Sequence, residues 1–194
     1  MTSDPFALFA SWMAEAQASE PNDPDAMALA TASPDGRPSV RIVLMRRHGP
    51  DGFAFFTNLE SDKGRQIAAN PWGALAIHWK SLRKQVRAEG RLVQVTEADA
   101  DDYFASRSRN SRIGAWASDQ SRPLDARETF VARIEEAKAR FAEGEVPRPP
   151  HWSGFRLVPD RIEFWEDRDF RLHHRRLFTR PGEDEAWSEG LLYP

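Results

Sequence analysis

Short apolar runs separated by turn residues dominate much of the chain. Candidate strands lie at 26–32, 40–46 and 53–57, and the intervening segments are rich in Pro, Asp and Gly. Runs of this length with such boundaries are typical of strands joined by tight turns. The same texture returns in further segments, at 74–79, 85–95, 154–158, 161–165 and 171–178. The pattern predicts an antiparallel meander that continues to the C-terminal region.

Helical patterns interrupt these strands. Ser3 or Asp4 can cap an N-terminal helix within residues 1–20 that has Pro5 in its first turn. Three further helices are expected, at 61–70, 97–106 and 124–143. The fold is therefore expected to be mostly β (α+β), an antiparallel β-barrel with peripheral helices. We expect a single domain, 1–194, with a helical excursion at 97–145.

Composition removes several classes of protein. The chain has 194 residues, is 40% hydrophobic and contains no cysteine, so disulfides, thiolate nucleophiles and Cys-ligated metals are excluded. A net charge of -3 argues against general nucleic-acid binding. The sequence contains neither a bilayer-length apolar run nor a signal peptide, which predicts a cytoplasmic protein.

Arg171, His173 and Arg175 alternate along the last predicted strand. In a strand such residues project from one face, where two guanidiniums and an imidazole suit an anion or an electron-rich ring. The alternative is a solvated edge strand whose charges prevent aggregation.

A second candidate group comprises Tyr103, Arg107 and Ser111. Their spacing places them on one helical face if the helix continues past residue 106, and the three side chains suit phosphate oxygens. A surface helix produces such triplets by chance.

Two other segments carry possible anion ligands. Arg41 and Arg46 flank four apolar residues and are expected on opposite faces of a strand. Ser61 and Lys63 lie at a predicted helix N-terminus, which is a ready anion site, although Ser61 can equally be only a cap. The sequence has neither a Rossmann nor a P-loop motif, and its histidines lack metal-ligand spacing, so no metal is expected.

Taken in order, these segments resemble the pyridoxine/pyridoxamine 5'-phosphate oxidase family over nearly the whole chain. The similar pieces are RIVLMR (41–46), FTNLESDKG (56–64), the strand with Gln85, YFASRSRNSRIGAWASDQS (103–121), HWSGFRL (151–157) and IEFWEDRDFRLHHR (162–175). The resemblance implies an FMN-binding split β-barrel and a homodimer with its sites between the subunits.

The resemblance also implies roles for individual residues. FMN contacts would fall on Arg41, Ile42, Phe56, Thr57, Ser61, Lys63, Gln85, Gln120, Ser121, Trp165 and Arg175. The substrate phosphate would contact Arg46, Tyr103, Arg107 and Ser111, with the catalytic pair Arg171 and His173 beside the substrate ring. The implied reaction oxidises pyridoxine or pyridoxamine 5'-phosphate to pyridoxal 5'-phosphate, with O2 as acceptor and H2O2 as product.

The sequence departs from the family pattern near both expected phosphates. Arg46 stands where the family has Lys, which keeps the charge but changes its reach and donor geometry. Asp62 stands where the family commonly has Arg, and this reversal of charge predicts weaker FMN retention. Smaller departures are Phe56 for Tyr, Asn110 for Asp and His174 for Asp. Two alternatives therefore stay open: a split-barrel FMN oxidase or reductase with another substrate, and a non-catalytic protein that binds flavin or pyridoxal phosphate.

Overall fold

The structure, a computed structural model, describes residues 4–194. Within this range one antiparallel sheet contains β1 (Ala26–Ala32), β2 (Pro38–Leu44), β3 (Arg47–Gly49), β4 (Gly52–Asn58), β5 (Trp72–Trp79), β6 (Lys84–Gln94), β7 (Trp152–Glu166), β8 (His174–Thr179) and β9 (Ser188–Leu191). The helices are α1 (Pro5–Ser19), α2 (Asp62–Ala69), α3 (Glu97–Ser106), α4 (Arg109–Ala117) and α5 (Arg127–Arg140), with a short 3-10 turn, η1 (Asp169–Arg171). The predicted mostly β fold with peripheral helices is confirmed.

The long strand β7 pairs with three other strands of the sheet. It pairs with β6 along most of its length, while its other edge pairs first with β4 and then with β8. Pro159 falls between the two pairings on that edge, where its missing N–H breaks no β4 or β8 ladder. The predicted strands at 154–158 and 161–165 are therefore one continuous strand, which was not foreseen because Pro usually ends a strand.

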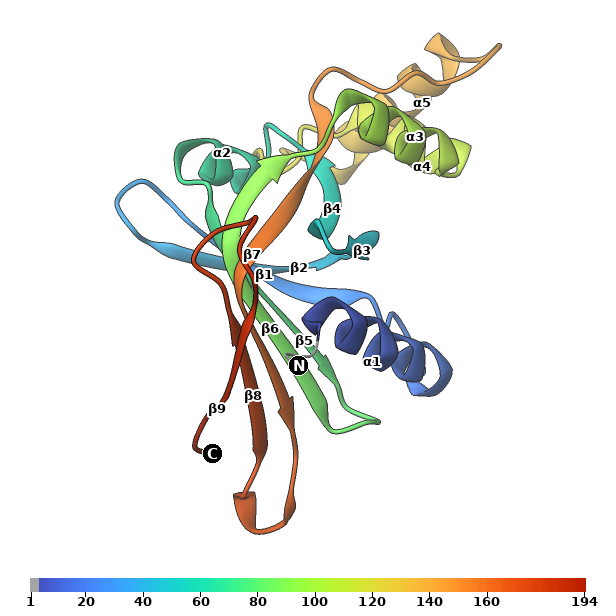
Figure 1. Cartoon of the computed structure of the whole chain (residues 1–194). Coiled ribbons are helices and arrows are strands. Elements are labelled where there is room, and N and C mark those ends of the chain that lie inside the picture. Colours follow the sequence, from blue (N-terminus) through green and yellow to red (C-terminus); the bar gives the residue numbers. More distant parts are fainter. Residues whose placement is uncertain (1–3) are drawn as a thin grey trace.

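Close packing at the β6–β7 irregularity requires a glycine. The register shifts between Glu89 and Gly90, and a Cβ on Gly90 would lie 2.1 Å from the carbonyl oxygen of Val158. The bulge bends the paired strands, and the whole sheet is strongly curled (Figure 1).

Helix α1 packs its apolar face against the curled sheet. Asp4 caps this helix by accepting a hydrogen bond from the Phe6 amide at 2.9 Å; the alternative cap, Ser3, lies outside the described residues. The buried ring of Phe9 lies 4.8 Å from that of Phe53 in β4, and Trp12 lies 5.1 Å from Phe164 in β7. These contacts tie the N-terminal helix to the main core.

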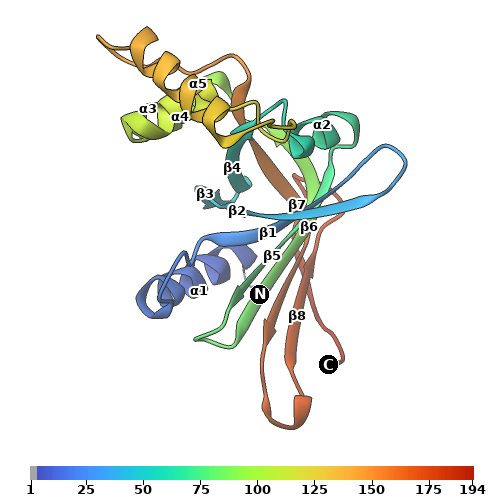
Figure 2. The same cartoon turned by 180° about the vertical axis from the view of Figure 1, so that it is seen from behind.

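Helices α3, α4 and α5 form a separate group beyond the β4 end of the sheet, far from the β8–β9 hairpin (Figures 1 and 2). A small core of their own, centred on Ile113, Ala117 and Ala137, holds α4 and α5 together. Helix α4 was not predicted: Ser108 caps it by accepting a hydrogen bond from the Ser111 amide, so only two residues separate the end of α3 from the start of α4. Within residues 4–194, no helix has the length and apolarity to span a bilayer.

Candidate functional site

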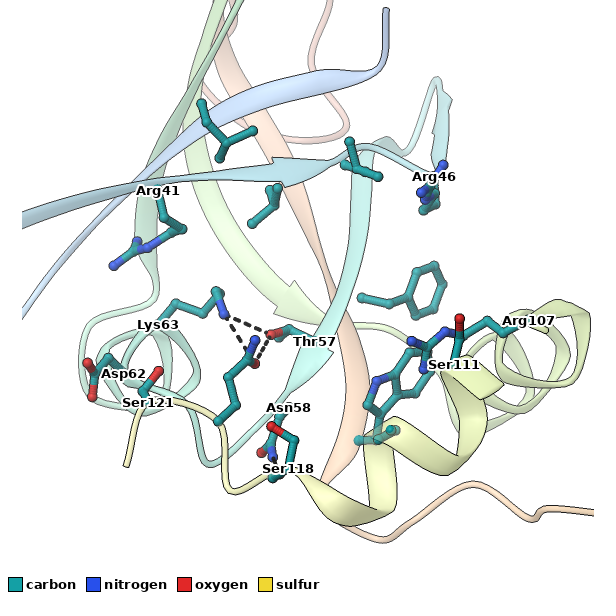
Figure 3. A pocket seen from close by; sticks show the side chains of 18 of the residues that line it. Arg41, Arg46, Thr57, Asn58, Asp62, Lys63, Arg107, Ser111, Ser118 and Ser121 are labelled. Atoms are coloured by element: carbon teal, nitrogen blue, oxygen red, sulfur yellow. Dashed lines mark hydrogen bonds between the residues drawn. The ribbon is translucent and has the colours of Figure 1, made fainter. Parts of the chain in front are cut away.

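A cavity of about 1090 Å³ opens between β2, β4, α2 and α4. Its lining includes four cationic side chains, and Figure 3 shows them at two separate ends. Arg41 and Lys63 lie at one end, and Arg46 and Arg107 at the other, with Thr57 between them. A single cavity therefore has two places where an anion can bind.

Arg41 is held rigidly at the first end. Its guanidinium donates hydrogen bonds to Thr31 Oγ1 at 2.5 Å, Ser39 Oγ at 2.8 Å and Gln66 Oε1 at 3.2 Å. Burial lowers the pKa of Arg41, and the negative charge of Asp62 opposes that effect. Neutral partners thus fix the side chain, and its positive charge is left for a ligand.

Lys63 is a buried cation at the same end of the cavity as Arg41. Its ammonium donates to Thr57 Oγ1 at 3.1 Å and to Gln120 Oε1 at 3.4 Å, both on the cavity wall. Burial and the nearby Arg41 lower the pKa of Lys63, whereas Asp62 raises it. Arg41 and Lys63 both line the cavity and repel each other electrostatically, so this end favours binding of a phosphate group.

Ser61 and Asp62, the two residues before Lys63, differ in whether they line the cavity. Ser61 is fully buried, caps α2 and does not line the cavity, so it lies behind Lys63, whose Nζ is 3.4 Å from its hydroxyl. Asp62 does line the cavity, but its carboxylate is 60% exposed and pairs with Arg65. The guanidinium of Arg65 therefore neutralises part of the negative charge of Asp62.

Arg107 forms the second cationic end. Its guanidinium stacks over the ring of Trp152 at 5.0 Å, and its buried Nη1 has no hydrogen-bond partner among residues 4–194. Burial lowers the pKa of Arg107, and Arg46 lowers it further, whereas Tyr103 opposes both effects. A buried donor without a protein acceptor beside a second cation fits an anion-binding site.

The residues grouped at this end by the sequence analysis do meet at the cavity, but the condition of one continuous helix is not fulfilled. Helix α3 ends at Ser106 and Arg107 is its C-cap, so Tyr103, Arg107 and Ser111 do not share one continuous helical face. They line the same cavity because the chain turns between α3 and α4. Similarly, β2 ends at Leu44, and Arg46 reaches the cavity from the segment after the strand rather than from its opposite face.

Aromatic rings form the wall near the second end. Phe56 stacks on Tyr103 with ring centroids 4.1 Å apart and an interplanar angle of 20°. Trp152 lies parallel to Phe56 at 5.6 Å. Ile42, 68% exposed, contributes an apolar surface from β2, and Ser121, with φ of 72°, lines the cavity from the loop after α4. Such a surface suits a flat ring.

A second group of predicted residues lies elsewhere in the same chain. Gln85, Trp165 and Arg175 are direct cross-strand neighbours on β6, β7 and β8, so they form one row across the sheet. The buried carboxylate of Glu163 accepts a hydrogen bond from Arg175 Nε at 2.7 Å and one from Arg87 at 2.6 Å. Glu163 thus holds the guanidinium of Arg175 in place within the row.

Arg171 and His173 belong to the loop beside this row. The predicted strand from 171 was wrong: β8 starts at His174, and Arg171 ends the turn η1 with φ of 62°, after Phe170 with φ of 57°. Arg171, His173 and Arg175 therefore do not alternate along one strand. His173 nevertheless packs on Trp165, with ring centroids 4.7 Å apart, and so joins the second group.

The two groups lie toward opposite ends of β7. Phe56 is paired with Gly154 near the start of this strand, and Arg175 with Trp165 near its end. At about 3.3 Å per residue, roughly 35 Å of strand separates these positions. None of Gln85, Trp165, Arg171, His173 or Arg175 lines the cavity. One copy of the chain therefore brings only the first group to the cavity.

Sequence reasoning missed several residues that hold the site. Gln66 and Thr31 orient Arg41, Trp152 supports Arg107, and Glu163 fixes Arg175. Glu163 was detectable in principle, because it is two residues before Trp165 and must face the same side of β7. The others depend on contacts between distant segments.

Comparison with known proteins places the chain in a family. The family profile described as pyridoxamine 5'-phosphate oxidase matches residues 13–141, and the profile of the pyridoxine 5'-phosphate oxidase C-terminal dimerisation region matches residues 152–194. The latter profile covers the entire second group except Gln85.

Individual relatives agree with these profiles. Proteins named pyridoxine/pyridoxamine 5'-phosphate oxidase from Sphingopyxis alaskensis and Gluconobacter oxydans are 64% and 57% identical, over 100% of this chain and 89% and 96% of theirs. The structure of PhzG from Burkholderia lata 383 in complex with tetrahydrophenazine-1-carboxylic acid has a TM-score of 0.92 and 33% identity, covering 100% of this chain and 94% of that one. The expected split-barrel fold is thereby confirmed, and the chain belongs to the pyridoxamine 5'-phosphate oxidase family.

Proposed function

We propose that this protein is an FMN-dependent oxidase that converts pyridoxine or pyridoxamine 5'-phosphate to pyridoxal 5'-phosphate. The observation that carries the proposal is the cavity with two cationic ends, one at Arg41 and Lys63 and one at Arg46 and Arg107. Two phosphate-bearing ligands bound together need this arrangement, and the names of the two relatives described above fit it.

The first end fits the FMN phosphate. Arg41 and Lys63 offer charge-assisted hydrogen bonds, and Thr57, Gln120 and Ser121 add polar groups on the same wall. The second end fits the smaller phosphate of the substrate, because the unpartnered Nη1 of Arg107 would gain an acceptor there. Tyr103 and Ser111 complete that end with hydroxyl groups.

Bound FMN would supply the two-electron chemistry, accepting a hydride from the C4' carbon of the substrate and delivering both electrons to O2 to give H2O2. The protein has the task of positioning. Arg46 and Arg107 anchor the substrate phosphate, and the aromatic wall orients its ring. Arg171 and His173 would complete the site beside the ring.

These last residues would come from a second copy of the chain. Val40 and Ile42 on the edge strand β2 are 69% and 68% exposed, and Phe170 and Leu172 beside Arg171 are 93% and 67% exposed. Apolar side chains this exposed at both places support burial between two subunits. The match of residues 152–194 to a dimerisation region supports a homodimer, and we propose that each of its sites combines the cavity of one subunit with the Arg171–Arg175 segment of its partner.

A direct experiment tests the proposal. The purified protein is expected to show a yellow flavin spectrum, which pyridoxine 5'-phosphate bleaches under anaerobic conditions and which air restores with release of peroxide. Mass spectrometry of the released cofactor should identify FMN. A flavin spectrum that neither B6 phosphate bleaches would overturn the substrate assignment, and absence of flavin binding would overturn the enzyme assignment.

A second candidate is an FMN enzyme of the same fold with a substrate that lacks phosphate. The 33% identity to PhzG, whose structure contains tetrahydrophenazine-1-carboxylic acid, favours it. The free donor on Arg107 distinguishes the two candidates. Inorganic phosphate should compete with a phosphorylated substrate at that end, but a substrate without phosphate would not depend on Arg107 to the same degree.

A further inference from the structure

Within residues 4–194, Arg46 forms one ion pair, and its partner Asp25 lies outside the cavity. Nη1 of Arg46 donates a hydrogen bond to Oδ2 of Asp25 at 2.8 Å. Arg46 lines the cavity, whereas Asp25 does not. Asp25 precedes β1 and Arg46 follows β2, so the pair lies just beyond Ala26 and Leu44, the last partners of the β1–β2 ladder. Arg46 therefore contacts a carboxylate behind the cavity wall as well as the cavity itself.

Backbone hydrogen bonds fix both members of this pair. The Met45 amide donates to the carbonyl of Asp25 at 2.9 Å, and the Arg46 amide donates to a carbonyl of β4 at 2.8 Å. The carbonyl of Pro24, next to Asp25, accepts a hydrogen bond from the indole of the buried Trp79 at 2.8 Å. The carboxylate and the guanidinium are thus attached to the same part of the sheet, at a fixed separation.

The Asp25–Arg46 pair is too exposed to contribute much to stability. The side chains of Arg46 and Asp25 are 35% and 25% exposed. Ion pairs with this much solvent contact stabilise a fold weakly, because water screens the charges and ordering two side chains costs entropy. Its place beside the cavity therefore gives the better account of this pair.

Asp25 offsets a repulsion between two cations of the cavity. Arg46 and Arg107 lie at the same end (Figure 3), and the charge of Arg46 lowers the pKa of Arg107, so the two guanidiniums repel each other. The negative charge of Asp25 acts on Arg46 from outside the cavity. Arg46 can therefore stay near Arg107 before any ligand binds.

The shape of the guanidinium allows two anions to be contacted at once. Asp25 takes a hydrogen bond from Nη1 of Arg46, and the planar fork of an arginine has further N–H donors on Nη2 and Nε. A lysine at this position would have to share one nitrogen between both anions, without a fixed plane. Arg46 is thus suited to contact Asp25 and a phosphate simultaneously.

We propose that Asp25 is a positioning residue for substrate binding, which holds one arm of the Arg46 guanidinium so that the remaining donors are ready for the substrate phosphate. The proposal rests on the proposed function for the identity of that phosphate. A guanidinium that is already ordered loses less freedom when the anion binds, which strengthens binding. The charge of Asp25 repels the anion, which weakens it. We expect the ordering effect to dominate, because Arg46 already neutralises the carboxylate.

The test uses the FMN-loaded protein, so that added inorganic phosphate reports on the second end of the cavity. Asp25→Ala removes both the acceptor and the charge, whereas Asp25→Asn removes the charge and keeps an oxygen that can accept the same hydrogen bond. Asp23→Asn removes a charge from an exposed residue of the same loop and is the matched control. Phosphorus-31 NMR titration measures the dissociation constant of phosphate, and steady-state kinetics with pyridoxine 5'-phosphate measures KM and kcat.

Asp25→Ala is expected to raise the phosphate dissociation constant and KM about fivefold, with kcat unchanged. Asp25→Asn should stay within about twofold of the native values, because the acceptor remains. Asp23→Asn should match the native protein. In the Arg46→Lys background, Asp25→Ala should have no further effect on either constant, since there is no fork left to orient.

Tighter phosphate binding in both Asp25 variants would overturn the inference, because Asp25 would then act only as a repelling charge. An unchanged phosphate dissociation constant in Asp25→Ala would overturn it as well, and urea denaturation would show whether the residue serves stability instead. Absence of turnover in the native protein would refute the proposed function. The phosphate dissociation constants would still decide the role of Asp25, since they do not depend on turnover.

Discussion

The carboxylate of Glu163 accepts a hydrogen bond from Nε of Arg175 at 2.7 Å, although only 3% of the Glu163 residue is exposed. Arg87 donates to the same carboxylate from the neighbouring strand. Burial on its own raises the pKa of Glu163, but the hydrogen bonds and charges of Arg175 and Arg87 outweigh it, so the pKa lies below its ordinary value.

Glu163→Gln is therefore expected to destabilise the fold. The variant should lose about 1–3 kcal/mol of the free energy of unfolding at pH 7, because the hydrogen bonds to charged groups weaken. A carboxyl group with a depressed pKa in the folded state stabilises the protein fully above its unfolded pKa and loses that effect as the pH falls through its folded pKa. Urea denaturation of both proteins should show the difference shrinking below about pH 4.

Glu145→Gln is a matched control for this prediction, because Glu145 is exposed. It should leave stability unchanged at every pH. A Glu163→Gln penalty that stayed constant down to pH 3 would show that the loss comes from packing rather than from charge.

Arg107→Met is expected to raise the KM for pyridoxine 5'-phosphate about 10- to 100-fold, the equivalent of one lost charge-assisted interaction of about 1.5–3 kcal/mol. The FMN dissociation constant should stay the same, because Arg107 lies at the other end of the cavity from Lys63. Steady-state kinetics and flavin fluorescence titration measure the two quantities. Arg37→Met, on an exposed residue, is the control, and an unchanged KM for Arg107→Met would contradict the assignment of the substrate phosphate.

Lys63→Met is expected to weaken FMN binding at least tenfold, since the phosphate would lose a buried cationic donor. Titration of FMN into the apoprotein measures this effect. The exposed Lys80, changed to Met, should bind FMN normally. Equal affinities in the two variants would place the FMN phosphate elsewhere.

Asp62→Asn is expected to tighten FMN binding about threefold to tenfold. One charge at about 5–6 Å is worth roughly 3 kcal/mol at an effective dielectric of about 20, but exposure and the ion pair with Arg65 reduce this considerably. Fluorescence titration measures the FMN affinity, and Asp184→Asn, a change at an exposed residue, is the control. Unchanged affinity would mean that Arg65 already neutralises Asp62.

Subunit mixing tests the proposed site between two copies. At limiting FMN, Lys63→Met and Arg175→Met are each expected to lose most of their activity, yet a mixed dimer contains one site in which both residues are native. Co-expression of the two variants should therefore restore about a quarter of the native sites, if the subunits pair at random. Mixed dimers without activity would contradict a shared site.

The sequence predicted local structure well where capping and turn residues mark the boundaries. The helix over 97–106 has the predicted bounds, and β1 occupies the predicted residues 26–32. The second helix, α4, was not predictable from periodicity, because it is short and starts at its own cap, Ser108. The turn at Phe170 and Arg171 escaped prediction because non-glycine residues rarely adopt positive φ.

Prediction of the site also succeeded where local patterns carry the information and failed where contacts between distant segments do. The residues at the cavity were identified from local motifs and a family resemblance, but their supports were not. Gln66 in α2 reaches Arg41, and Trp152 in β7 reaches Arg107, only because segments far apart in sequence are neighbours in the fold. Sequence separation hides such contacts, whereas alternation along one strand, as for Glu163 and Trp165, is visible.

Strand β7 runs unbroken past Pro159. Since one end of β7 pairs with Phe56 of the cavity wall and the other end carries Trp165, the length of the strand sets the spacing between the two groups of predicted site residues. Adding or deleting residues in this strand would shift one group of site residues relative to the other, even though neither group itself had changed.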